Sequence, residues 1–139
     1  DILNIHIFDS PLHEGAISRV LAYAKLAYKV MSRNGDKDKK IWITEIGCPG
    51  VPKGVKVNNW WMGNNPGEEE QAAWVEDVFS GLLKIDNVEK VFWAFFRDTK
   101  EHWRDGTDYF GLVRWDFTPK PAFAAYRECV KKYMHNSIF

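Results

Sequence analysis

Three short apolar runs, each followed by a segment with helical periodicity, constrain the fold of this chain more than any other feature. The runs span residues 2–8, 41–46 and 91–96, and nearly every residue in them is apolar. Such runs are typical of strands that are covered on both faces. Strands that alternate with helices pair in parallel through right-handed crossovers. The pattern therefore predicts an α/β fold, either a doubly wound sheet or part of a (β/α)8 barrel.

The helices between these strands are marked by apolar residues at three-to-four spacing and by end signals. The first is expected to end at Asn34, before a glycine. The second is expected to begin with Asn65 as its cap and Pro66 at its first position, and Gly81 inside it is expected to permit close packing. Thr118 is expected to cap the third helix.

The composition excludes several classes of protein. A chain of 139 residues makes one domain. Nineteen basic residues balance nineteen acidic ones, which argues against nucleic acid and anionic membrane surfaces as partners. Two cysteines, Cys48 and Cys129, are too few for a disulfide scaffold, and either one bridge or two thiols fits. Asp1 opens directly onto an apolar run, so we expect a processed or truncated product, located outside the cell or in the cytoplasm.

Polar and aromatic side chains cluster just after each run, at the ends of strands where both architectures place their active sites. The sequence contains no G-x-G-x-x-G and no Walker A motif, which removes the main support for a nucleotide site. His13 and His102 lack the spacing of a zinc motif. We therefore expect no cofactor and no metal.

Glu45 and His6 are the polar residues that stand out inside these apolar strands. Strand alternation puts Ile41, Ile43 and Glu45 on one face, and if that face is a barrel interior, Glu45 emerges at its mouth. A carboxylate there is either a structural ion-pair partner or a catalytic group. His6 shares a face with Phe8 and is either a satisfied core residue or a functional one.

Tryptophan is frequent near the same strand ends. Trp93 lies within the third run on a face with Phe95, and a core position is the better interpretation for Phe95. Trp60 and Trp61 are adjacent in a loop rich in glycine and asparagine. They form either an exposed stacking surface for a flat ligand such as a sugar or a lid packed on its own fold.

These residues resemble landmarks of the clan A glycoside hydrolases, which are retaining (β/α)8 barrel enzymes. Residues 43–47, Ile-Thr-Glu-Ile-Gly, look like the motif of the seventh barrel strand. Residues 4–8 are similar to the sixth strand, and residues 91–96 to the eighth, in which a cis peptide would follow Trp93. Gly111-Leu112-Val113 and Lys120-Pro121-Ala122 resemble the closing segment of the clan.

The resemblance implies that residues 1–139 are the C-terminal part of a catalytic barrel, namely its last three βα units, strands 6–8. It assigns Glu45 as the catalytic nucleophile of a cellulase-like or xylosidase-like enzyme that acts on a β-linked oligosaccharide or polysaccharide. His6 would hold the substrate or orient the carboxylates, and Trp93 would stack on the sugar. Trp60 and Trp61 are expected to form an outer platform.

Two departures from the clan pattern bear on activity. Phe8 stands where a tyrosine hydroxyl often bonds the nucleophile, so Glu45 needs another donor. The Asn-Glu pair that carries the general acid/base on the fourth strand has no counterpart here. We therefore expect the isolated chain to be inactive and to need the missing N-terminal barrel half, or a partner chain that covers its open sheet edges. The carboxylates considered as replacements are Glu14, Asp98, Glu101 and Asp105.

Three alternatives to a glycosidase fragment stay open. The chain is a non-catalytic carbohydrate-binding module, a half-barrel that assembles with itself, or a flavodoxin-like ligand binder. Nothing in the sequence indicates the phosphate site that a flavodoxin-like binder requires.

Overall fold

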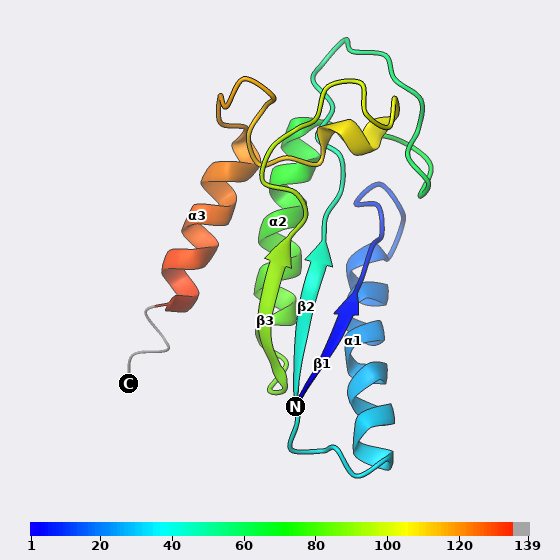
Figure 1. Cartoon of the computed structure of the whole chain (residues 1–139), viewed down its shortest axis with the longest axis vertical. Coiled ribbons are helices and arrows are strands. Elements are labelled where there is room, and N and C mark those ends of the chain that lie inside the picture. Colours follow the sequence, from blue (N-terminus) through cyan, green and yellow to red (C-terminus); the bar gives the residue numbers. More distant parts are fainter. Residues whose placement is uncertain (135–139) are drawn as a thin grey trace.

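Residues 1–134 are described by the computed structural model, in which three parallel strands form one sheet with the order β1-β2-β3 (Figure 1). Strands and helices alternate along the chain, so the predicted α/β fold is confirmed. The elements in chain order are β1 (Ile2–His6), α1 (Ala16–Arg33), β2 (Lys40–Ile46), α2 (Glu68–Leu82), β3 (Val88–Trp93), the 3-10 helix η1 (Gly106–Tyr109) and α3 (Pro121–Met134).

The helices cover one face of the sheet, and α3 packs beside α2 (Figure 1). Ile41 and Ile43 point to the helices and are fully buried. On the opposite face Asn4, His6 and Phe92 are exposed. The prediction that both faces are covered is therefore wrong for this chain: an apolar run shows that a strand avoids water, but it does not show which segment covers each face.

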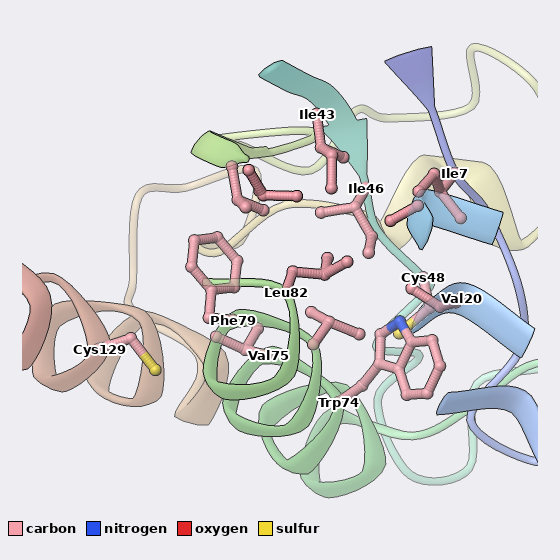
Figure 2. Close-up of a cluster of buried hydrophobic side chains, with 14 of the residues drawn as sticks. Ile7, Val20, Ile43, Ile46, Cys48, Trp74, Val75, Phe79, Leu82 and Cys129 are labelled. Carbon is pink, nitrogen blue, oxygen red and sulfur yellow. The ribbon is translucent and has the colours of Figure 1, made fainter. Parts of the chain in front are cut away.

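The core lies between the sheet and α2 (Figure 2). Ile43 and Ile46 project from β2 toward Val75 and Leu82 of α2, and all four side chains are fully buried. Burial of one such side chain contributes about 1.5–3 kcal/mol. This contact fixes the end of β2, and with it the residues that follow.

Helix α2 begins two residues later than predicted. Gly67 is its N-cap, and the Gly67 N–H donates to the Glu70 carboxylate at 3.0 Å. Asn65 instead donates to the Asn58 carbonyl oxygen at 3.1 Å and accepts from the Trp60 N–H at 3.3 Å. Asn65 therefore organises the preceding loop, because its side chain finds partners there that a cap position would not offer.

Close packing at Gly81 is confirmed. A Cβ atom at this position would lie 2.9 Å from Leu21 Cδ2, closer than real contacts allow. The absence of a side chain at Gly81 thus lets α2 approach α1.

Strand β3 lies three residues earlier than predicted. Val88 pairs with Ile41, and Trp93 is the last residue of the strand, in register with Ile46. After Trp93 the chain leaves the sheet, and a cis peptide joins Ala94 to Phe95, one bond after the predicted position. The apolar run continues past the strand because its last two residues are exposed aromatic side chains and not sheet residues.

A buried glutamine ties α2 to the loops that follow β2 and β3. Gln71 is fully buried, and its Nε2 donates to the carbonyl oxygens of Cys48 at 3.0 Å and of Phe110 and Gly111 at 3.3 Å. The two loops lie side by side beyond the tips of the strands in Figure 1. The strand ends are therefore fixed relative to each other.

Both cysteines are buried free thiols, which decides between the two possibilities left by the sequence. Burial raises the pKa of the Cys48 thiol well above its usual range. None of the helices in the described part of the chain has the length and apolar character to cross a membrane.

Candidate active site

Glu45 reaches the open face of the sheet through an irregularity in β2. The pairing with β1 advances from Ile5–Ile43 to His6–Glu45, so one extra residue of β2 is accommodated there. Ile43 and Ile46 stay buried, while the Glu45 side chain is 41% exposed. The prediction that Glu45 shares a face with Ile41 and Ile43 is therefore wrong, because regular alternation ends at this extra residue.

His6 is the neighbour of Glu45 across the strand pair. His6 Nδ1 lies 3.4 Å from Glu45 Oε2, and the His6 side chain is 49% exposed. One step further down the same face, the Thr44 hydroxyl donates to the Asn4 side-chain oxygen. The sheet thus presents a carboxylate and an imidazole to solvent, at the ends of its first two strands.

Trp93 ends the third strand and is in register with Ile46, the last residue of β2. It is half-buried against the core, and its indole Nε1–H donates to the Phe110 carbonyl oxygen at 2.9 Å. Phe95 is 39% exposed, so its expected core position is wrong. Its ring contacts Trp103 and Phe110 in the loop that follows β3.

The adjacent tryptophans Trp60 and Trp61 have different surroundings. Trp60 is 2% exposed, and its indole N–H donates to the Asn64 carbonyl oxygen at 2.7 Å. Trp61 is 60% exposed and lies on Phe110 in a stacked arrangement, with ring centroids 5.8 Å apart. The expectation that both form an outer platform is therefore wrong for Trp60. Trp60 is a core residue that supports Trp61, and the centroids of the two rings lie 4.9 Å apart.

Phe8 makes up part of the same support. Its ring meets Trp61 edge to face at 5.4 Å, and it lies 6.2 Å from Phe110. Phe8, where the sequence resemblance leads us to expect a tyrosine hydroxyl, thus holds an exposed tryptophan.

Asp9 fixes the loop after β1. Its nearly buried carboxylate accepts from Arg19 Nε at 2.7 Å and from the Ser10 N–H at 2.8 Å, and it lies 2.9 Å from His13 Nδ1. Burial raises the pKa of Asp9, but these hydrogen bonds outweigh burial, and the pKa lies below its usual value. Asp9 and Arg19 also line a cavity of about 230 Å³ beside His6.

Two of the four carboxylates considered as replacement acids already have structural partners. Asp98 is buried against Lys120, with Oδ1 3.1 Å from Nζ, and it accepts from the Gly111 N–H at 2.7 Å. Burial raises the pKa of Asp98 to about 6 against the attraction of Lys120. Asp105 accepts from the Thr107 N–H at 2.7 Å and caps η1. Both carboxylates therefore have structural roles, in the buried ion pair with Lys120 and at the start of η1.

Sequence reasoning missed the carboxylate that shapes the loop after β3. Asp108 is buried and accepts from the backbone N–H groups of His102, Trp103 and Arg104 at 3.0, 3.1 and 2.8 Å. Its position four residues after Arg104, in a Gly-Thr-Asp turn, gives only a weak local signal.

Within residues 1–134, no three histidine, cysteine, aspartate or glutamate side chains gather as a metal site would require. The reactive groups on this surface are therefore an exposed carboxylate and an imidazole, with aromatic rings in the same region.

Several solved structures with similar folds are glycosidases or a glucanase by name. A GH2 β-galacturonidase from Eisenbergiella tayi matches with a TM-score of 0.71 and 17% identity over 94% of this chain. A β-glucuronidase from Bifidobacterium dentium matches with a TM-score of 0.65 and 17% identity over 92%. A GH128 endo-β-1,3-glucanase from Amycolatopsis mediterranei matches with a TM-score of 0.61 and 20% identity over 93%. No curated protein matches.

The chain spans only 23%, 20% and 44% of these three structures, respectively. At such identities the likeness concerns the fold. The sequence itself gives the closer assignment, because residues 1–126 match the family model described as the glycosyl hydrolase catalytic core. This match covers all three strands, Glu45 and the loops at the strand ends, and the chain therefore belongs to the glycosyl hydrolase catalytic core family.

Proposed function

We propose that this chain is the C-terminal part of a (β/α)8 catalytic barrel that hydrolyses β-linked glycosides with retention of configuration. The single observation that carries the proposal is the exposed Glu45 carboxylate at the end of the central strand, 3.4 Å from His6. Barrel enzymes hold their reacting groups at these strand ends. Family membership supports glycoside hydrolysis as the reaction.

In the proposed reaction Glu45 is the nucleophile. One Glu45 oxygen attacks the anomeric carbon, and the bond from that carbon to the leaving oxygen breaks as a second carboxylic acid protonates the oxygen. Water, deprotonated by the same second group, then attacks the glycosyl-enzyme and releases Glu45. In retaining enzymes the two carboxyl groups lie about 5–5.5 Å apart. We assign the second group to a barrel segment outside this chain.

The neighbours of Glu45 take the supporting roles. His6, whose Nδ1 lies 3.4 Å from Glu45 Oε2, orients the carboxylate or binds a substrate hydroxyl. Trp93 stacks on the sugar that is cleaved, since its ring is held beside the strand ends by the bond to Phe110. Trp61 offers a second aromatic face, and Trp60 supports it from below.

The edge of the molecule at β1 supports the assignment of this chain to a larger barrel. In α1, the helix next to β1, Tyr23, Leu26 and Val30 repeat at helical spacing and are all exposed. With Leu3 and Met31 they line an apolar cavity of about 400 Å³. A preceding βα unit would pair with β1 and cover this stripe, as it would in a closed barrel.

The first experiment is the intact mass of the protein as its source makes it, followed by assays of that protein. A mass above about 30 kDa, the scale of a full barrel, fits the proposal. The assays use a soluble β-1,3-glucan, carboxymethylcellulose, xylan and an aryl β-glucuronide. Glu45→Gln is expected to lower hydrolysis by several orders of magnitude, while the exposed control Glu69→Gln leaves it unchanged.

Azide tests the role of Glu45. With an activated aryl β-glycoside, Glu45→Ala plus azide gives an α-glycosyl azide if Glu45 is the nucleophile and a β-glycosyl azide if it is the acid/base. Equal hydrolysis by Glu45→Gln and the unmodified protein would refute the proposal. A non-catalytic carbohydrate-binding or self-assembling half-barrel would then be the better account.

A further inference from the structure

An exposed aromatic pair follows β3 and has no part in the proposed reaction at Glu45. Phe95 and Trp103 are 39% and 43% exposed. Their rings are parallel within 1°, with centroids 5.6 Å apart, so they overlap only in part. Large aromatic side chains that stay exposed together on a soluble domain mark a binding surface more often than isolated ones do.

The loop that carries Trp103 is held rigidly. The Asp108 carboxylate accepts from three consecutive backbone N–H groups, those of residues 102–104, and from the Thr99 hydroxyl. Glu101 and Arg104, which flank the turn, have φ values of 55° and 60°. Residues other than glycine rarely occupy this region. A loop in this conformation presents Trp103 without further ordering, which reduces the entropic cost of binding.

The pair is linked to Trp61 through the buried ring of Phe110. Phe95 lies 6.1 Å from the buried Phe110, and Phe110 lies 5.8 Å from Trp61. Trp61 contacts Phe8, which follows β1, whereas Phe95 follows β3. Glu45 lies one residue before the end of the central strand, so the segments after β1 and β3 that carry the two exposed aromatic faces flank the strand with the carboxylate.

Polar residues line a hollow in the loop that carries Trp103. The loops after β2 and β3 line this cavity of about 560 Å³, with Lys56, Asn58, Glu101 and Arg104 in its wall. A hydrogen bond from Asn58 Nδ2 to the Arg104 carbonyl oxygen joins the two loops there. Aromatic faces beside charged and amide groups suit a ligand with apolar ring faces and many hydroxyls, which is the chemistry of a sugar.

We propose that Phe95 and Trp103 form a second sugar-stacking site, placed on the side of Glu45 opposite to Trp61. It takes a sugar ring of an extended glycan that crosses the strand ends. This inference rests on the proposed function, because that function supplies the reason for a glycan at Glu45. It adds that the substrate is a chain with sugar units on both sides of the reacting bond.

The test measures binding by the protein as its source makes it, through the change in tryptophan fluorescence within seconds of mixing. The probes are the hexasaccharides and disaccharides of β-1,3-glucan, β-1,4-glucan and β-1,4-xylan. Trp103→Ala is expected to weaken binding of the preferred hexasaccharide about tenfold, or about 1.4 kcal/mol, and to leave the disaccharide unaffected. Trp103→Phe is expected to retain most of the affinity.

The matched control is Trp115→Ala, which removes another exposed tryptophan outside this aromatic surface. The inference is overturned if Trp103→Ala binds the hexasaccharide as tightly as Trp115→Ala does. It is also overturned if Trp103→Ala weakens both probe lengths alike, or if no hexasaccharide binds. The fluorescence experiment measures binding and not hydrolysis. Normal hydrolysis by Glu45→Gln would therefore refute the proposed function of Glu45 without deciding whether Phe95 and Trp103 bind a sugar.

Discussion

At the scale of single residues, Gly111 sits where no side chain fits. A Cβ atom there would lie 2.1 Å from the Asp98 nitrogen and 2.5 Å from the Val113 oxygen, both of which are backbone atoms. Gly111→Ala is expected to lower the free energy of unfolding by about 3 kcal/mol or more, because backbone cannot move aside cheaply. Urea unfolding followed by circular dichroism measures this.

Gly81 provides the matched comparison for that prediction. Its nearest obstacle is the end of the Leu21 side chain, which can rotate. Alanine also favours a helix interior over glycine by about 1 kcal/mol. Gly81→Ala is therefore expected to change stability by less than about 1 kcal/mol, and equal losses for the two variants would contradict the argument.

At the scale of elements, the loop after β3 depends on the charge of Asp108. Burial raises the pKa of Asp108, but the hydrogen bonds from Thr99, Trp103 and Arg104 outweigh it and hold the pKa below 3.8. The carboxylate therefore contributes stability that is present above about pH 3.8 and is lost as pH falls through the lower folded-state value.

Asp108→Asn is expected to cost about 1–3 kcal/mol at pH 7, since an amide cannot accept all of these hydrogen bonds. The gap in Tm between this variant and the unmodified chain is expected to narrow as pH falls below 4. Differential scanning calorimetry between pH 3 and 7 measures the gap, with the exposed Asp38→Asn as control. A gap that stays constant with pH would contradict the role of the charge.

The elements also show how far the sequence could predict the structure. The apolar pattern was enough to locate β1, β2 and α1 to within about two residues, since the signal for each lies within its own segment. The bounds of β3 were not predictable, because the aromatic run continues past the end of the strand. The orientation of Glu45 was not predictable either, because it depends on an extra residue in β2. Adjacent tryptophans look alike in the sequence, and only packing separates Trp60 from Trp61.

At the scale of the whole molecule, the exposed stripe on α1 governs association. When residues 1–139 are produced alone, we expect them to self-associate through Leu26, Val30 and the edge of β1, because exposed apolar stripes and free strand edges seek partners. Leu26→Lys with Val30→Lys is expected to shift the mass in light scattering toward the monomer. Glu69→Gln with Glu76→Gln changes the net charge by the same amount at exposed positions of α2, and an equal shift there would contradict the assignment.

Because of the extra residue in β2, the stability of the strand and its chemistry depend on different side chains. Two consecutive side chains, Thr44 and Glu45, turn to the open face, while Ile43 and Ile46 on either side remain in the core. A regular strand would offer only one outward position over this stretch. The chain can therefore exchange a reacting group at its rim without disturbing a buried contact, so that new specificities can evolve on an unchanged core.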